Sequence, residues 1–121
     1  MSSDRGIILL AHGSRDPLWR EPIERVAARI REQDAQAIVT CAYLELTEPD
    51  LRAAAAQLLA QGVRAIRVVP MFLGLGRHAR KDLPRLVGEL RQRHPQMELT
   101  LQPAIGEDAR LLDLMAQIAL S

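Results

Sequence analysis

The fold of this chain is decided by the stretch Gly6-Ile7-Ile8-Leu9-Leu10-Ala11, which runs directly into His12-Gly13. An apolar run without alternating polar residues is typical of a strand buried on both faces of a parallel sheet. Two runs of similar character follow at residues 38–46 and 65–73, and a weaker one follows at residues 97–101. The sequence therefore predicts four strands.

Amphipathic stretches separate these runs. Pro22 suits the first turn of a helix, and apolar residues follow it at the spacing of one helix face. These residues are Ile23, Val26, Ala27 and Ile30. A later helix is expected to start at Asp82 and Pro84 and to end at His94, and a last one covers about residues 107–120.

The helix after the second strand carries the clearest boundary signals. Thr47 is placed to cap it, Pro49 suits its first turn, and Asp50 sits where a capping-box carboxylate would. Gly62 supplies the left-handed residue that ends it.

Strand and helix alternate four times, which predicts the α/β class. Right-handed crossovers then give one four-stranded parallel sheet flanked by helices. The 121 residues have the size of one ordinary domain, and no linker or low-complexity segment divides them. We therefore expect a single domain over residues 1–121.

The composition excludes several classes of function. Sixteen basic residues face fifteen acidic ones, and there is one Phe, one Tyr and one Trp, so neither a basic surface nor stacking platforms for nucleic acid are expected. No apolar run approaches the roughly 20 residues that span a bilayer, and residues 1–5 lack the apolar stretch of a signal peptide. The single Cys41 fits a reducing compartment. We expect a cytoplasmic protein with no nucleic-acid or membrane partner.

Three residues with metal-binding side chains follow or end successive strands. His12 follows the first strand, Glu45 ends the second and His78 follows the third, each 33 positions from the next. Because ligands bind outside the carboxyl ends of parallel strands, we expect all three at one edge of the sheet. Imidazole and carboxylate suit first-row divalent metals, and two or three protein ligands leave positions open for a metal that is handed on.

Each of these residues also has a simpler interpretation. A histidine after a strand is often a loop or capping residue, and Glu45 would also suit a solvent-exposed strand end. The basic residues Arg77, Arg80, Lys81 and Arg85 are compatible with a solvated helix face, although beside His78 they would attract a polyanion. No phosphate-loop or dinucleotide motif is present, Ser14 has no hydrolase context, and His94 is assigned no chemistry.

Three blocks of sequence resemble the small CbiX-type sirohydrochlorin chelatases. They are Leu9-Leu10-Ala11-His12-Gly13-Ser14-Arg15-Asp16-Pro17, then Ala42-Tyr43-Leu44-Glu45-Leu46-Thr47-Glu48-Pro49, and then Val69-Pro70-Met71-Phe72-Leu73 running on to His78, Asp82, Leu83 and Pro84. The blocks occur in order, are correctly spaced, and cover about the first 85 residues.

The resemblance implies a half of a class II chelatase fold that inserts a divalent metal into sirohydrochlorin. Co²⁺ is the first choice, with Fe²⁺ or Ni²⁺ as alternatives, for cobalamin or siroheme synthesis. His12 and His78 would bind the metal, and Glu45 would act as ligand or base. A non-catalytic metal or tetrapyrrole carrier of the same fold is the alternative.

The same resemblance implies the remaining features. Ser14, Arg15, Arg77, Arg80 and Lys81 are expected to contact the acidic tetrapyrrole. A homodimer with the cleft between subunits is expected, since larger relatives carry two such domains. No organic cofactor is implied, and the divalent metal is a substrate. Metal capture should weaken as the pH falls through the ordinary imidazole pKa of about 6.5.

Overall fold

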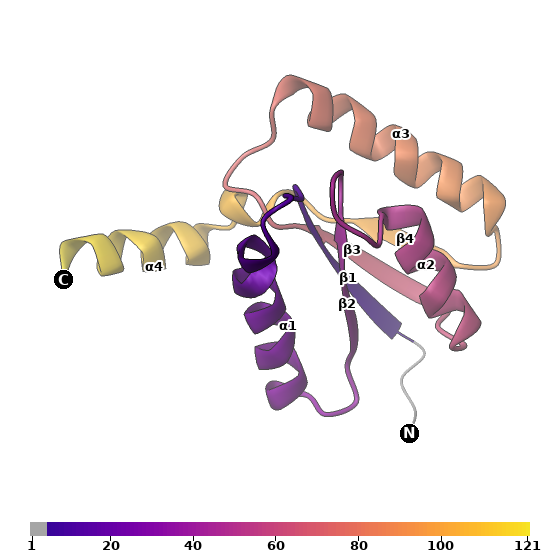
Figure 1. Cartoon of the computed structure of the whole chain (residues 1–121), viewed down its shortest axis with the longest axis horizontal. Helices are drawn as coiled ribbons and strands as arrows, with labels where there is room; N and C mark the ends of the chain where they lie inside the picture. Colours follow the sequence, from indigo (N-terminus) through magenta and orange to yellow (C-terminus); the bar gives the residue numbers. More distant parts are fainter. Residues whose placement is uncertain (1–4) are drawn as a thin grey trace.

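The computed structural model describes residues 5–121 and contains a parallel sheet with helices packed on its faces (Figure 1). The strands are β1 (Arg5–Ala11), β2 (Ile38–Tyr43), β3 (Ala65–Pro70) and β4 (Glu98–Leu101). The helices are α1 (Glu21–Gln33), α2 (Leu51–Ala60), α3 (Arg77–Arg93) and α4 (Ala109–Leu120), with short 3-10 turns η1 (Pro17–Arg20) and η2 (Ile105–Glu107).

The strand order is β2-β1-β3-β4, and every pairing is parallel. This confirms the predicted α/β class. The chain leaves β1 toward β2 on one side and returns across β1 to β3 on the other, so the order reverses beside β1. In such sheets the crevice at the carboxyl ends of the strands is the usual place for a ligand.

The two faces of the sheet carry different cores. The larger core lies under α2 and α3 and includes Ile8, Leu10, Ile66 and Val68 from the strands. We call this side the α2/α3 face. The smaller core lies under α1 and includes Leu9 and Val39, and we call this side the α1 face. Alternate residues of each strand point to opposite faces, which explains why the strands read as continuous apolar runs.

The second and third strands are shorter than predicted. β2 ends at Tyr43 and β3 at Pro70, so Glu45 lies in a loop and not at a strand end. Leu46 adopts a positive φ of 65°, which no regular strand contains. Residues 44–46 and 71–73 were predicted as strand because they are mostly apolar. The sequence alone does not distinguish a leucine that is exposed in a loop from a leucine that is buried in the core.

Two helix starts also differ from the prediction. Asp50 caps α2 by accepting a hydrogen bond from the Ala53 amide (2.8 Å), so Thr47 is not the cap. Helix α3 begins at Arg77, with the Arg80 amide donating to the Gly76 carbonyl (3.0 Å). Pro84 therefore lies inside α3, where it removes one backbone hydrogen bond but does not set the start.

Other boundaries agree with the prediction. Gly62 has a φ of 89° just after α2, as a left-handed helix stop requires. His94 caps the carboxyl end of α3. Among residues 5–121, none of the helices has both the length and the apolar content needed to cross a bilayer.

Candidate metal centre

The loops that follow β1 and β2 are joined at the backbone. The Leu44 amide donates to the carbonyls of Ala11 (3.0 Å) and His12 (3.1 Å), and the Glu45 amide also donates to the His12 carbonyl (3.1 Å). The parallel pairing thus continues beyond the last strand residues. As a result His12 and Glu45 leave the sheet side by side.

Gly13 allows this close approach. It is buried and has a φ of 106°, a conformation that favours glycine, and a Cβ at this position would collide with the Glu45 carbonyl oxygen. Next to it, the Ser14 amide donates to Thr47 Oγ1 (3.1 Å), and Thr47 Oγ1 donates to the Ser14 carbonyl (2.8 Å). Thr47 therefore holds the two loops together instead of capping α2.

His12 and Glu45 form a close pair at the carboxyl edge of the sheet. Their Nε2 and Oε1 atoms are 2.9 Å apart, and the side chains are 60% and 56% exposed. The pair is thus accessible to a solute, and its imidazole and carboxylate lie within hydrogen-bonding distance of each other. Such a pair offers two ligands for a divalent metal, or a base whose proton the carboxylate stabilises.

His78 is not part of this pair. It is exposed and is the second residue of α3, which starts on the carboxyl side of the sheet as expected. Residues 71–76 lead away from the sheet edge before α3 begins (Figure 1). Within residues 5–121, no three His, Cys, Asp or Glu side chains gather closely enough to hold a metal ion. The structure thus brings two of the three predicted ligands together.

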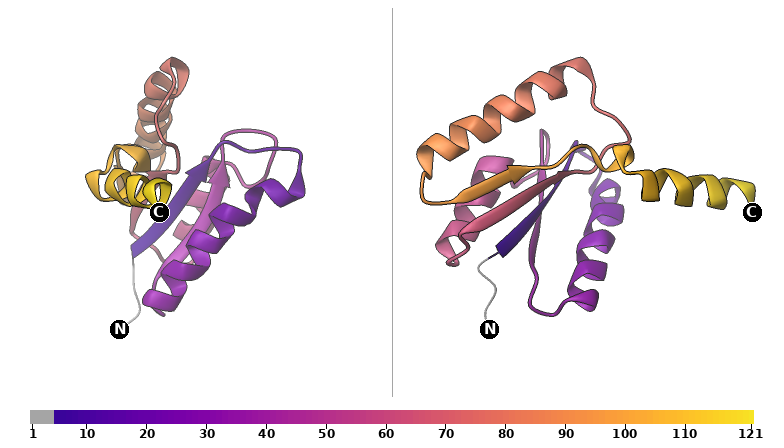
Figure 2. Two further views of the ribbon diagram at one scale, coloured as in Figure 1. Left: turned by 90° about the vertical axis from the view of Figure 1, so that its left-hand side faces the viewer. Right: turned by 180° about the vertical axis from the view of Figure 1, so that it is seen from behind.

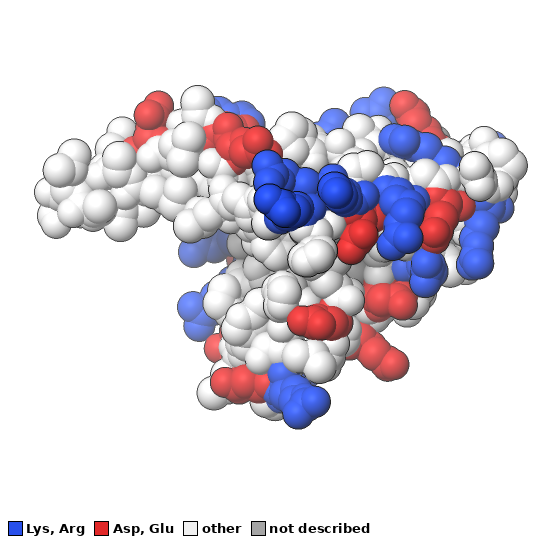
Figure 3. Space-filling view, turned by 90° about the horizontal axis from the view of Figure 1, so that it is seen from above, with Lys and Arg blue, Asp and Glu red and all other residues white. Residues whose placement is uncertain are grey.

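Basic side chains lie over the start of α3 (Figure 3). Arg77, Arg80 and Lys81 are exposed and, within residues 5–121, have no ion-pair partner, whereas Arg85 lies 3.4 Å from Asp82. Arg15, two residues after Gly13, is also exposed. The Ser14 hydroxyl accepts from the Asp16 amide (3.1 Å), so it has a local role in shaping this loop.

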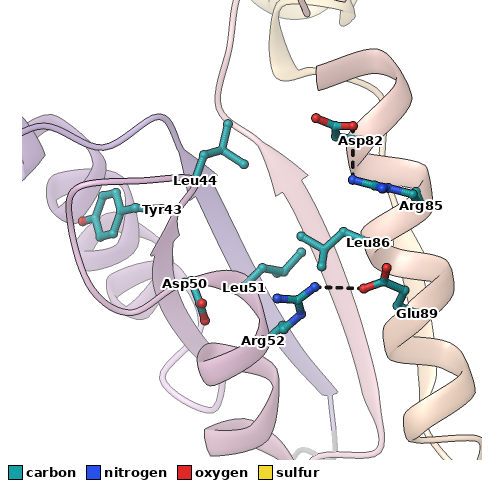
Figure 4. A pocket seen from close by; sticks show the side chains of 9 residues that line it. All are labelled: Tyr43, Leu44, Asp50, Leu51, Arg52, Asp82, Arg85, Leu86 and Glu89. Carbon is teal, nitrogen blue, oxygen red and sulfur yellow. Dashed lines mark hydrogen bonds and ion pairs between the residues drawn. The ribbon is translucent and has the colours of Figure 1, made fainter. Parts of the chain in front are cut away.

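The sequence did not indicate two hollows that are lined by residues of the loop between β2 and α2. One of about 760 Å³ runs along loop residues 43–50 and includes Glu45 in its wall. Another of about 200 Å³ lies between α2 and α3, with Leu44 at its mouth and the Arg52–Glu89 pair across it (Figure 4). Arg52 NH2 lies 2.9 Å from Glu89 Oε2, and this hydrogen bond lowers the Glu89 pKa. Because these residues are far apart in sequence, no spacing pattern could reveal the hollow.

Exposed apolar side chains surround the same edge of the sheet. Leu18, Leu44, Leu46 and Leu73 come from three different loops and are all solvent-exposed. Trp19 lies near Tyr43, with ring centroids 6.2 Å apart.

Burial raises the pKa of the half-buried Cys41 thiol, and the nearby Glu24 charge adds to this effect, which makes Cys41 a poor nucleophile.

Comparison with known proteins places the chain in a family. A sequence model of the CbiX family matches residues 6–120, so the chain belongs to the CbiX family. The sirohydrochlorin cobaltochelatase of Methanosarcina acetivorans is 30% identical over 122 residues, which cover 95% of this chain and 94% of that protein. That of Methanococcus aeolicus is 35% identical over 82 residues, covering 68% of this chain and 57% of that protein. The matched segment thus spans just over half of the latter.

Solved structures agree with the fold. A crystal structure of a CbiX protein from Marinobacter aquaeolei superimposes with a TM-score of 0.81 and 38% identity, covering 95% of this chain and 93% of that one. The sirohydrochlorin chelatase SirB of Bacillus subtilis, solved in complex with cobalt, gives a TM-score of 0.78 at 23% identity. This chain is covered to 97%, but it accounts for only 49% of the SirB chain.

Proposed function

We propose that this protein inserts a divalent metal into sirohydrochlorin, with Co²⁺ as the first choice and Fe²⁺ or Ni²⁺ as alternatives. The observation that carries the proposal is the exposed His12–Glu45 pair, 2.9 Å apart at the carboxyl edge of a CbiX-family sheet. Support also comes from M. acetivorans cobaltochelatase, which aligns over nearly its whole length.

The chemistry of insertion matches the side chains at this edge. A metal ion that enters the macrocycle replaces two pyrrole N–H protons, so the site must present the metal and accept protons. His12 is assigned to the metal, Glu45 to the metal or to a released proton, and His78 to the same ion because α3 begins on that side of the sheet. The metal is a substrate, and no organic cofactor is required.

The surroundings of the pair suit a flat, acidic ring. The exposed leucines at the edge would pack against the macrocycle, and the hollow beside Glu45 has the volume of an ordinary small-molecule site. Arg15, Arg77, Arg80 and Lys81 would bind the carboxylates of the ring. Ser14 would contact the ring through its loop.

The remaining parts of the proposal concern the assembled protein. Residues 1–121 act as one CbiX-type domain, and two copies form a homodimer with the cleft between them. Support comes from SirB, of which this chain covers 49%, about one half. The protein acts in the cytoplasm, where its single cysteine stays reduced, in the synthesis of cobalamin or siroheme.

The test is a metallation assay followed by the absorption spectrum of sirohydrochlorin. Purified protein is mixed with the macrocycle and with Co²⁺, Fe²⁺ or Ni²⁺ in parallel. The wild type should metallate the ring well above the spontaneous rate. His12→Ala and His78→Ala should each lower kcat/KM for the metal at least 100-fold, and Glu45→Gln should lower kcat at least tenfold.

His94→Ala is the matched control, because it removes the third histidine from the far end of α3. It should keep the wild-type rate. A wild-type protein that shifts the spectrum without exceeding the spontaneous rate would be a carrier, and the enzymatic proposal would be wrong. An unchanged rate in His78→Ala would remove His78 from the ligand set.

A further inference from the structure

Leu46 has a backbone conformation that leucine seldom adopts. Its φ is 65°, whereas the other two residues with positive φ in the described part of the chain are the glycines Gly13 and Gly62. In this region a side chain brings its Cβ close to the following carbonyl oxygen, and glycine avoids that cost. Among residues 5–121, position 46 is therefore the one at which a bulky residue occupies a conformation that favours glycine.

The turn around Leu46 is closed by a hydrogen bond and held from both sides. The Thr47 amide donates to the Glu45 carbonyl (2.7 Å). Such a bond between residues two apart, with a positive φ between them, defines the rare and strained form of the γ-turn. Before the turn, the Glu45 amide donates to the His12 carbonyl (3.1 Å). After it, Thr47 Oγ1 donates to the Ser14 carbonyl (2.8 Å). The loops after β1 and β2 lie side by side (Figure 2), and their contacts maintain the strained turn.

The packing of the fold does not explain a leucine at this position. Leu46 is 57% exposed, and neither core of the described chain contains it. Glycine would form the same turn with less strain, because the hydrogen bonds that hold the turn come from the neighbouring residues. An apolar side chain that strains its own backbone and contributes little to the core indicates a role in binding.

Leu46 lies directly beside the candidate metal centre. Glu45, the residue before it, has its Oε1 atom 2.9 Å from His12 Nε2. Leu44, Glu45 and Leu46 all line the hollow of about 760 Å³ along this loop. Small-molecule sites combine an apolar lining with a few polar groups that fix the orientation of the ligand. A side chain at position 46 can therefore contact a ring whose metal and protons are handled at the adjacent pair.

We propose that Leu46 is a substrate-binding residue whose side chain packs on the macrocycle of sirohydrochlorin, and that the strained turn is retained because it presents this side chain beside the pair. Leu18, Leu44 and Leu73 are exposed at the same edge, but none of them has a positive φ. The backbone thus distinguishes Leu46 from the other leucines of this edge. The inference rests on the proposed function for the identity of the ring, but not on catalysis of metal insertion.

The test separates the side chain from the backbone with two variants, Leu46→Ala and Leu46→Gly. Both remove the side chain beyond Cβ, so each should raise the Kd of metal-free sirohydrochlorin about tenfold in a titration followed by absorption. Only the glycine relieves the strained φ. In urea unfolding, the midpoint of Leu46→Gly should therefore lie roughly 0.5 M above that of Leu46→Ala. At an ordinary position the order is the reverse, because glycine destabilises regular structure relative to alanine.

Two matched variants control the binding measurement. Leu46→Met keeps a flexible apolar side chain of similar volume and should leave the Kd within threefold of the wild type. Val26→Ala shortens an apolar side chain that is 36% exposed on α1, outside this edge, and should leave the Kd unchanged. Sedimentation should show the same oligomeric state for Leu46→Ala as for the wild type.

The outcomes distinguish this inference from the proposed function. Wild-type ring binding in Leu46→Ala would overturn the contact, and a glycine variant no more stable than the alanine variant would overturn the strain. A change of oligomeric state in Leu46→Ala would assign the side chain to a contact between subunits instead. A wild type that does not bind sirohydrochlorin would overturn both the inference and the proposed function, whereas a wild type that binds the ring without metallating it would overturn the proposed function alone.

Discussion

At the scale of single residues, Thr47 connects the two loops that carry the His12–Glu45 pair. Its hydroxyl is both acceptor and donor for the Ser14 backbone, at 3.1 and 2.8 Å. Ser14 follows the Gly13 turn, and Thr47 follows Glu45 by two residues. The two hydrogen bonds therefore act together with the backbone bonds to His12 in setting the distance between the loops that carry the pair, although Thr47 itself need not touch metal or ring.

Replacing Thr47 by valine keeps the shape of the side chain and removes both hydrogen bonds. We expect a loss of about 1–2 kcal/mol in the free energy of unfolding, and metal affinity lowered about tenfold, as is usual when a group that orients a ligand is lost. Chemical denaturation and calorimetric titration with Co²⁺ measure the two effects.

Thr47→Ser is the matched control, since it retains the hydroxyl, and it should restore most of both quantities. If Thr47→Val loses stability but binds Co²⁺ as the wild type does, the threonine supports the fold without positioning the pair.

At the scale of elements, the start of α4 depends on one carboxylate. Asp108 accepts from the Arg110 amide (2.8 Å), and the Arg110 guanidinium donates to both of its oxygens (3.0 and 2.7 Å). These bonds to Arg110 lower the pKa of Asp108 to about 2 from the ordinary 3.8. Because the folded pKa is the lower one, the ionised form favours the capped helix.

The stabilising effect of Asp108 should be fully present above about pH 4 and should be lost as the pH falls toward 2. Cα chemical shifts of residues 109–112 should therefore move toward coil values over this range. Asp108→Ala should show reduced helicity there already at pH 7, with no further change down to pH 2. Asp113→Asn, which removes an acidic residue of α4 that is not a cap, should titrate like the wild type.

Elements with local signals were predictable, and contacts between distant residues were not. Apolar runs located all four strands, and Gly62 and His94 marked helix ends correctly. Thr47 was misassigned because a threonine before Pro49 looks like a cap, whereas its partner Ser14 lies 33 residues away. The start of α3 was misplaced because Pro84 is a strong helix-start signal and the residues from Arg77 to Lys81 carry none.

The candidate site, too, was only partly predictable from the sequence. His12 and Glu45 follow neighbouring strands, and parallel pairing brings the ends of such strands together whatever the loop sequence. His78 is separated from β3 by residues 71–76, and the path of such a loop depends on tertiary contacts. One of these is the bond between Phe72 and Gly106. The strand order therefore predicts that His12 and Glu45 lie side by side. It does not predict how far His78 lies from this pair.

At the scale of the whole molecule, charge is nearly balanced but unevenly placed. The net charge is +1, yet Arg77, Arg80 and Lys81 form an exposed basic group over the start of α3 (Figure 3). A local field of this kind attracts a polyanion even when the total charge is small, and salt screens it over about 10 Å at 0.1 M.

The combined change Arg77→Gln, Arg80→Gln and Lys81→Gln should therefore raise KM for sirohydrochlorin about tenfold at low ionic strength while kcat changes little. The difference from wild type should shrink at 1 M salt, where screening acts over about 3 Å. The matched control removes the same three charges elsewhere, by Arg25→Gln, Arg29→Gln and Arg93→Gln on α1 and the far end of α3. Equal KM values for the two triple variants would mean that net charge, and not this basic group, attracts the substrate.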